Sequence, residues 1–215
     1  MPRPATRHRP AHPHLSAQRS ARWLLAGLLL LAGTAAGAAQ TVAEPVPDLQ
    51  RLCLECHQGD SDRVQAPLLE GQQHDYLARQ LRQFQQRHRD SFPMSSIVAG
   101  MSAAELDDLA RRLAQQPWPS RPQAVNATAV ARGADLARQA GCGQCHGTDL
   151  AGGSDGPRLA GQHAGYLQRQ LAAFLDGRRQ HPDRADGQPW LAKSSAQDLS
   201  ALSQYLHAAG RTGQP

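Results

Sequence analysis

The stretches Cys53-Leu54-Glu55-Cys56-His57 and Cys142-Gly143-Gln144-Cys145-His146 decide how this 215-residue chain folds. They are two copies of one pattern, Cys-x-x-Cys-His, that lie 89 residues apart and together use all four cysteines of the chain. A redox-active dithiol needs no histidine after its second cysteine, and a zinc ribbon places its two cysteine pairs closer together. The repeated pattern is instead typical of covalent attachment of c-type haem.

Covalent attachment joins the two thiols of such a motif to the haem vinyl groups as thioethers and makes the following histidine an axial iron ligand. We therefore predict two haem c groups as cofactors. The chain has only three residues each of Trp, Tyr and Phe, too few for two conventional cores, and two porphyrins would supply the missing apolar bulk. The predicted attachment residues are Cys53 and Cys56 for haem 1 and Cys142 and Cys145 for haem 2, and the predicted axial ligands are His57 and His146.

The first 39 residues have the composition of an export signal. Five arginines and no acidic residue precede or adjoin an apolar run over residues 23–32, and small residues follow up to Ala38 and Ala39. This pattern predicts a Sec-type signal peptide over residues 1–39, and its apolar run is too short to span a bilayer. We therefore expect a periplasmic protein without stable membrane association after cleavage. An uncleaved anchor is the alternative, because the basic region is long.

The excess of basic over acidic residues in the chain comes entirely from this leader. The whole chain has 23 Lys and Arg against 18 Asp and Glu, a formal net charge of +5, whereas the chain after residue 39 has 18 of each. Four haem propionates would make the holoprotein mildly acidic. A strongly basic surface of the kind that binds nucleic acid is therefore excluded, and we expect no nucleic-acid partner.

The rest of the chain is an internal repeat. Each haem motif is followed by Pro-x-Leu-x-Gly-Gln, at 67–72 and 157–162, and then by Tyr-Leu-x-x-Gln-Leu-x-x-Phe, at 76–84 and 166–174. Apolar residues three and four positions apart predict a helix with one buried face in each half. A second helix in each half is predicted after a serine followed three residues later by an acid, with leucines at matching offsets. No segment alternates as a strand does.

A proline-rich stretch separates the two halves. Pro117, Pro119 and Pro122 fall within six residues, which a helix cannot accommodate and which favours an extended, stiff tether. We predict an all-α protein of two tandem cytochrome c-like domains, each wrapped around one covalently attached haem. The predicted boundaries are 40–115 for domain 1, 116–126 for the linker and 127–215 for domain 2.

Over residues 48–209 these motifs resemble the dihaem cytochrome c4 family. The two Cys-x-x-Cys-His motifs, the paired Pro-x-Leu-x-Gly-Gln segments and the serine-capped last helices carry the resemblance. It implies electron transfer in the periplasm, often toward terminal oxidases, by two domains packed about a pseudo-twofold axis. It also implies that the carbonyls of Pro67 and Pro157 accept hydrogen bonds from Nδ1 of the axial histidines, which orients each imidazole.

The two halves differ where the family has its distal methionine. Met94 follows Pro93 and lies eight residues before Ser102, so the resemblance implies His/Met coordination of haem 1. The other methionine of this half, Met101, is expected in the core. A thioether ligand stabilises ferrous iron and raises the reduction potential of such a haem.

The second half has no methionine, so the sixth ligand of haem 2 stays open. Eight residues before Ser195 stands Gly187, within a loop rich in Pro and Gly. One alternative is that His181 completes a bis-histidine haem with a lower potential. A second is an open or water-bound iron, and a third is that Lys193 or another group binds.

These alternatives separate two classes of function. An electron carrier would pass electrons between periplasmic donor and acceptor proteins, with a terminal oxidase or a dehydrogenase as candidates. An open haem 2 would instead permit a haem enzyme or a gas sensor, which also needs a distal acid–base group. The polar residues His181, Asp183, Arg184 and Asp186 are the candidates for such a group. We predict an electron carrier without catalytic residues; a cytochrome subunit of a periplasmic dehydrogenase is a further alternative.

Several other polar side chains are expected outside the haem sites. We expect His88 and His207 on the surface, and His74 and His163 beside the Gly-Gln turns or facing solvent. Charged residues near the two haems are expected in solvated loops, where they could also steer a redox partner; these are Arg87, Arg89 and Asp90 in the first half and Arg178, Arg179 and Asp183 in the second.

Overall fold

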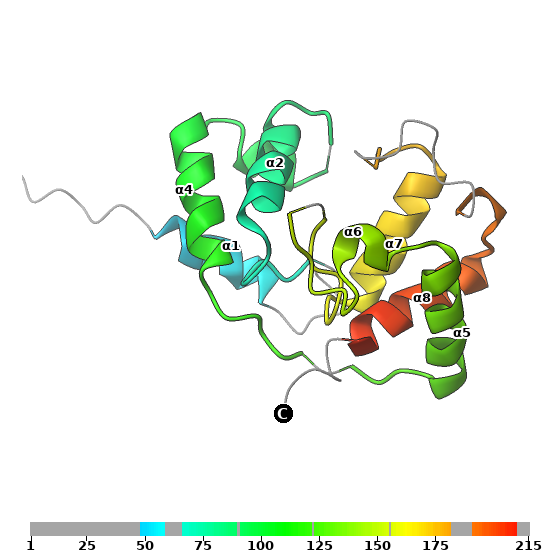
Figure 1. Ribbon diagram of the computed structural model, residues 1–215. Helices are drawn as coiled ribbons and strands as arrows, with labels where there is room; N and C mark the ends of the chain where they lie inside the picture. Colours follow the sequence, from blue (N-terminus) through cyan, green and yellow to red (C-terminus); the bar gives the residue numbers. More distant parts are fainter. Residues whose placement is uncertain are drawn as a thin grey trace, which may run out of the picture. The chain divides into compact units, whose positions relative to one another are not determined.

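The computed structural model describes residues 48–58, 66–89, 91–121, 123–154, 156–181 and 191–209, and within these ranges it consists of helices joined by loops, without a strand (Figure 1). The predicted signal peptide lies outside the described residues. The first half contains α1 (Leu49–His57), α2 (His74–Gln85), α3 (Met94–Ile97) and α4 (Ala103–Ala114). The second half contains α5 (Ala127–Gln139), α6 (Gly143–His146), α7 (Ala164–Leu175), the 3₁₀ turn η1 (Leu191–Lys193) and α8 (Ala196–Ala209).

The last helix of each half begins where the serine patterns predict. In α4 the Ser102 hydroxyl accepts a hydrogen bond from the Glu105 backbone N–H (3.3 Å), and the Glu105 carboxylate accepts one from the Ser102 backbone N–H (2.7 Å). Ser195 and Asp198 make the same reciprocal pair at α8, at 3.2 and 2.9 Å. Each pair satisfies backbone donors that a helix start would otherwise leave without partners.

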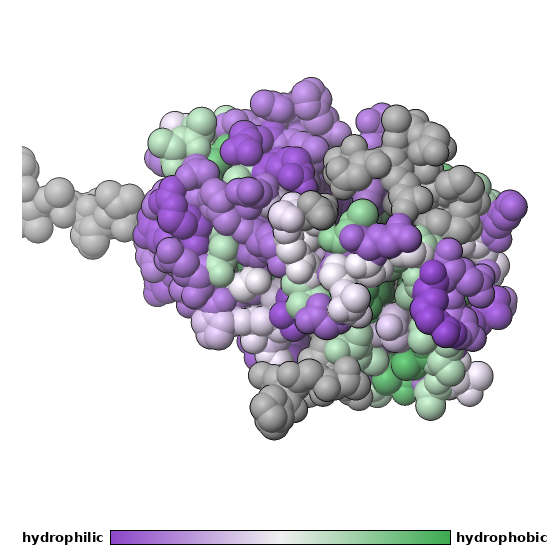
Figure 2. All heavy atoms as spheres, in the orientation of Figure 1, coloured by the Kyte–Doolittle hydropathy of each residue, from purple (hydrophilic) through white to green (hydrophobic). Residues whose placement is uncertain are grey.

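The core of the first half lies between α2 and α4, with α1 and α3 at its margins. Its apolar residues come from the helix faces that the three-and-four spacing predicts. Hydrophilic residues dominate the surface over α2 and α4 on the face shown in Figure 2. Met94 and Met101 are partly buried against this core. The buried leucines and aromatic are Leu77, Leu81, Phe84, Leu106, Leu109 and Leu113.

The core of the second half depends on a close approach of two helices. α8 packs against both α5 and α7. Gly133 of α5 lies directly against α8, where a Cβ atom would collide with the Ala201 carbonyl oxygen and stand 2.6 Å from the Tyr205 Cβ. The absence of a side chain at this position therefore lets the two helices meet.

We expect Gly133→Ala to lower the free energy of unfolding by about 1 to 3 kcal/mol, because the backbones of α5 and α8 must separate to admit the methyl group. Urea unfolding of the holoprotein measures the change. Gly165→Ala in α7 is the matched control, since its nearest neighbour is an Arg169 side-chain atom at 3.6 Å. That substitution should be neutral or stabilise by about 0.5 to 1 kcal/mol. Equal effects of the two substitutions would contradict the helix-contact argument.

The repeated Gly-Gln turns connect each haem-side loop to the last helix of its half. The Gly71 N–H donates to the Leu113 carbonyl (3.0 Å), and the Gly161 N–H donates to the Leu206 carbonyl (3.1 Å). Both glycines have positive φ, +65° and +79°, which glycine adopts without steric cost. A Cβ on Gly71 would also stand 3.0 Å from the Trp118 backbone nitrogen, so the segment after α4 packs directly on this turn.

His207 corrects one expectation from the sequence. It is not on the surface but 1% exposed, on the flank of the apolar face of α8. Its Nδ1 donates to the Gln162 carbonyl (2.9 Å), and its Nε2 accepts from the Gln123 N–H (3.1 Å). His163 is buried as well, whereas His88 is exposed as predicted. The partners of His207 lie 45 and 84 residues away, so no local pattern reveals them.

Within the described ranges, no helix combines the length and the apolar composition that crossing a membrane requires.

Candidate functional site

One cavity connects the two halves of the repeat. Its volume is about 800 Å³, and its walls are mostly leucine, aromatic and other apolar side chains. This is at the upper end of the usual range for a small-molecule or cofactor pocket, about 300 to 1,000 Å³. The predicted attachment cysteines, axial histidines and hydrogen-bonding prolines line it together with both main distal candidates; these residues are Cys53, Cys56, His57, Pro67, Met94, Cys142, Cys145, His146, Pro157 and His181.

The two axial histidine candidates have matching surroundings. His57 at the end of α1 and His146 at the end of α6 each place Nδ1 2.7 Å from a proline carbonyl, that of Pro67 and Pro157 respectively. A carbonyl only accepts hydrogen bonds, so the proton is on Nδ1 and the lone pair of Nε2 is available to a metal. Burial lowers the pKa of His57, which favours the same neutral, metal-binding form.

The cysteines beside these histidines are thiols without disulfide bonds. Cys53 and Cys56 lie on α1, while Cys142 and Cys145 lie at and within the short helix α6. Gly156 gives the His146 ring its space, because a Cβ there would stand 2.9 Å from Nδ1. The donor set and the space around it therefore suit covalent haem attachment on both sides of the cavity.

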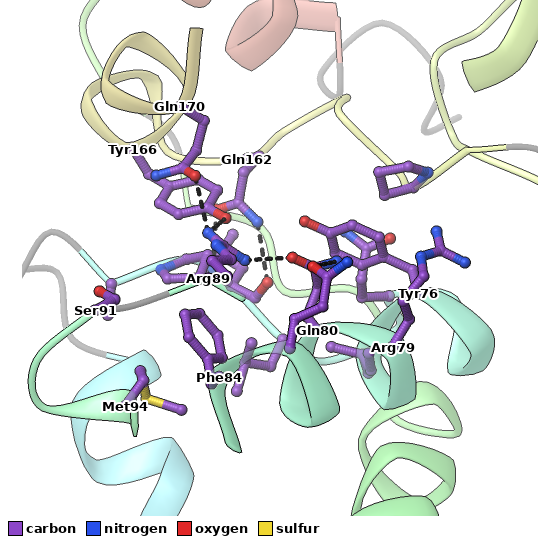
Figure 3. Close-up of a pocket in the computed structure, with 18 of the residues that line it drawn as sticks. Tyr76, Arg79, Gln80, Phe84, Arg89, Ser91, Met94, Gln162, Tyr166 and Gln170 are labelled. Carbon is purple, nitrogen blue, oxygen red and sulfur yellow. Dashed lines mark hydrogen bonds between the residues drawn. The ribbon is translucent and has the colours of Figure 1, made fainter. Parts of the chain in front are cut away.

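The candidates for the distal position differ between the halves. Met94 opens α3 and lines the cavity next to the first core (Figure 3). In the second half, the His181 ring lies with its centroid 6.3 Å from that of His146 and 5.4 Å from that of Phe174. Lys193 is exposed on η1 and does not line the cavity. The other loop candidates of the second half, Gly187, Asp183, Arg184 and Asp186, lie outside the described residues.

Two arginines that line this cavity, Arg89 and Arg179, each donate hydrogen bonds to the other half, and Figure 3 labels Arg89. Arg89 donates to the Tyr166 hydroxyl (3.1 Å) and to the Gln170 side-chain oxygen (2.8 Å) of the other half. Exactly 90 positions later in the repeat, Arg179 donates to the Tyr76 hydroxyl and to the Gln80 side-chain oxygen, each at 3.0 Å.

Each arginine is also tied to its own half. Arg89 donates to Gln80 (2.6 Å) and Arg179 to Gln170 (2.6 Å), and the two guanidinium groups lie over the rings of the phenylalanines at 84 and 174. Burial raises the pKa of Tyr166, but the positive charges of Arg89 and Arg179 outweigh it and lower this pKa to about 8. We call these six residues, Tyr76, Gln80, Arg89, Tyr166, Gln170 and Arg179, the arginine cluster.

Two glutamines of the repeated motif join the halves through the backbone. Gln162 accepts from the Leu68 N–H and donates to the Leu68 carbonyl, both at 2.9 Å. In the equivalent contact, Gln72 accepts from the Arg158 N–H (2.8 Å) and donates to the Arg158 carbonyl (3.0 Å). Each glutamine therefore forms two hydrogen bonds with the backbone of the Pro-x-Leu segment in the opposite half. These two equivalent contacts are related by a pseudo-twofold axis.

Known proteins resemble this chain in sequence and in fold. A sequence profile described as Cytochrome c matches residues 130–209. Cytochrome c4 of Thiocapsa roseopersicina is 33% identical over 169 residues, which cover 72% of this chain and 85% of that protein. The chain belongs to the cytochrome c4 family.

Two further comparisons extend this likeness over both halves. The thiosulfate dehydrogenase electron acceptor of Stutzerimonas stutzeri (strain A1501) is 32% identical over 219 residues, 91% of this chain and 100% of that protein. The crystal structure of reduced recombinant cytochrome c4 from Pseudomonas stutzeri superposes with a TM-score of 0.65 at 27% identity, and the match covers 73% of this chain and 93% of that one. The predicted fold of two tandem all-α cytochrome c domains is confirmed. This cytochrome c4 is a dihaem electron-transfer cytochrome with two covalently bound haem c groups.

For this cytochrome c4, the expectation that Arg89 and Arg179 lie in solvated loops is wrong. Both are partly buried and point into the cavity wall between the halves, and within the described residues neither forms a salt bridge with a carboxylate. Enclosed guanidinium groups are costly unless an anion compensates them. Haem carries two propionates, so the arginine cluster fits the charge of the cofactor that its cavity accommodates.

The helical patterns of the sequence do not identify the arginine cluster or the crossing glutamines. A signal was present in the repeat, because Gln72 matches Gln162, Tyr76 matches Tyr166 and Arg89 matches Arg179 after a shift of 90 residues. Polar residues that recur at equal spacing in two halves indicate a shared contact. Their partners belong to the opposite half, so helical periodicity cannot identify them.

Proposed function

We propose that this chain is a periplasmic electron carrier whose two haems share one cavity and are reduced by one electron each. The observation that carries the proposal is that both Cys-x-x-Cys-His motifs line this cavity. Cys53, Cys56, His57 and Met94 would hold haem 1. Cys142, Cys145 and His146 would hold haem 2.

The residues of the chain support this function in two ways. The Pro67 and Pro157 carbonyls hold the imidazoles of His57 and His146 by their Nδ1 protons and raise their basicity as ligands. The apolar walls exclude water and keep the solvent reorganisation that accompanies electron transfer small. When bound, each haem supplies the ferric–ferrous couple.

The arginine cluster would bind haem propionates. Arg89 and Arg179 each present N–H donors inside the cavity, and guanidinium groups pair well with carboxylates. The hydrogen bonds from Arg89 to Tyr166 and from Arg179 to Tyr76 hold the two guanidinium groups in the cavity wall, away from bulk water. Charge compensation then holds the haems and the two halves together.

The partners follow from the relatives only as a proposal. One relative is named a thiosulfate dehydrogenase electron acceptor, and this chain covers its full length. We propose that a periplasmic dehydrogenase donates electrons to this cytochrome and that a downstream acceptor such as a terminal oxidase receives them. The predicted leader over residues 1–39 would direct export, and residues 40–115 and 127–215 would form the two domains around the 116–126 linker.

A spectroelectrochemical titration of the holoprotein from a periplasmic fraction tests this function. We expect two reversible one-electron reductions per chain and no consumption of added hydrogen peroxide. Turnover of peroxide would contradict the carrier function and favour a haem enzyme. Recovery of the holoprotein only in the cytoplasmic fraction would contradict the proposed location.

A further inference from the structure

The second half places a second imidazole, that of His181, close to the axial candidate His146. The ring centroids of His146 and His181 are 6.3 Å apart, and their planes meet at 78°. Both rings line the cavity, and His181 is only partly exposed. The space between the two rings is therefore part of the space that a haem would occupy.

The distance between the rings matches two imidazoles bound to one metal. A metal–imidazole bond is about 2 Å long and a ring nitrogen lies roughly 1.2 Å from its centroid, so two ligands on opposite sides of one metal have centroids about 6.4 Å apart. His146 already commits Nδ1 to the Pro157 carbonyl, which leaves its Nε2 for the metal. Direct edge-to-face packing of aromatic rings covers about 4.5 to 7 Å, so the test must separate it from coordination.

The surroundings of His181 hold it at this place. Its ring packs against Phe174 of α7, at 5.4 Å between centroids and 61° between planes. Two residues earlier, Arg179 is tied to Tyr76 and Gln80 of the opposite half and stacks over the same Phe174 ring. The chain that leads into His181 is thus anchored on both sides of the cavity.

The first half has a different residue at the equivalent position. A shift of 90 residues places Ser91 where the second half has His181. The Ser91 backbone exchanges hydrogen bonds with Ser95 of α3, the helix that begins with Met94. A serine hydroxyl is a poor iron ligand, so the first half relies on Met94, three residues further along, whereas the second half offers an imidazole at the earlier position.

We propose that His181 is the sixth ligand of haem 2, opposite His146, so that this cytochrome has one His/Met and one bis-histidine haem. The inference rests on the proposed function, because it takes haem 2 to be attached at Cys142 and Cys145. Methionine stabilises ferrous iron more than imidazole does, so haem 2 has the lower potential. One electron that enters the second half then reduces haem 1 and leaves haem 2 oxidised, which sets the direction of transfer toward the first half.

The test compares His181→Ala with His88→Ala, which changes an exposed histidine of the first half. The wild-type holoprotein should show two low-spin haems by electron paramagnetic resonance, one of His/Met and one of bis-histidine type. Neither haem should bind carbon monoxide readily after reduction. In His181→Ala one haem of the two should become high-spin and bind carbon monoxide, while His88→Ala should match the wild type.

His181→Met keeps the proposal testable if the alanine variant does not fold. We expect it to gain a second His/Met spectrum and to raise the lower of the two midpoint potentials. The number of covalent haems per chain distinguishes a failure of the proposed function from a failure of the ligand assignment. Fewer than two covalent haems per wild-type chain would refute the proposed function itself. Two haems with an unchanged spectrum and carbon monoxide response in His181→Ala would refute only the ligand and indicate edge-to-face packing.

Discussion

The Cys142→Ser/Cys145→Ser protein is expected to carry one covalent haem per chain in place of two. A serine hydroxyl does not add to a haem vinyl group, so neither thioether of haem 2 can form. The second half would also lose the apolar group that fills its side of the cavity and should unfold at a lower temperature than the first. Pyridine haemochromogen absorbance per mole of protein measures the haem content, and the intact mass identifies what stays attached.

The equivalent variant of the first half, Cys53→Ser/Cys56→Ser, is the control for this result. It should also hold one haem, but its spectrum should lack the His/Met contribution, because Met94 belongs to the first half. The two single-haem proteins together should reproduce the wild-type spectrum. Two covalent haems in either variant would contradict the assignment of the four cysteines.

The Arg89→Gln/Arg179→Gln protein is expected to lower both midpoint potentials and to weaken the contact between the halves. A nearby positive charge favours the ferrous state, and two unit charges about 10 Å apart at an effective dielectric constant of about 20 interact by roughly 1 to 2 kcal/mol, on the order of 50 mV for one electron. The substitution also leaves haem propionates without their cations and removes hydrogen bonds to Tyr76 and Tyr166, at a cost of about 3 kcal/mol or more.

Redox titration and urea unfolding of the holoprotein measure these two effects. Arg178→Gln is the matched control, because Arg178 adjoins Arg179 in sequence but is exposed and pairs with Asp176 (2.7 Å) at the surface. An exposed pair of this kind contributes about 0 to 1 kcal/mol, so the control should keep wild-type potentials and nearly wild-type stability. Wild-type behaviour of the double variant would mean that the arginine cluster does not meet the propionates.

The structure also shows why some histidines could be placed from the sequence and others could not. His57 and His146 belong to a contiguous motif, so five residues suffice to predict their role. His207 belongs to no motif and lies beside the apolar face of α8, and the Gln123 and Gln162 backbone groups that bury it come from two other segments. Its position depends on how those segments meet, which the local pattern of α8 does not contain.

The features that could be predicted from the sequence alone are local or repeated. They are the haem-attachment motifs, the helices with their three-and-four spacing, the serine caps and the two-domain repeat. These features depend on residues within a few positions of one another, where chemistry and helix geometry act directly. Only the tertiary structure decided that Arg89 and Arg179 exchange partners between the halves and that His181 faces His146. These contacts join residues 35 to 103 positions apart, and their geometry exists only after the helices have packed around a shared cavity.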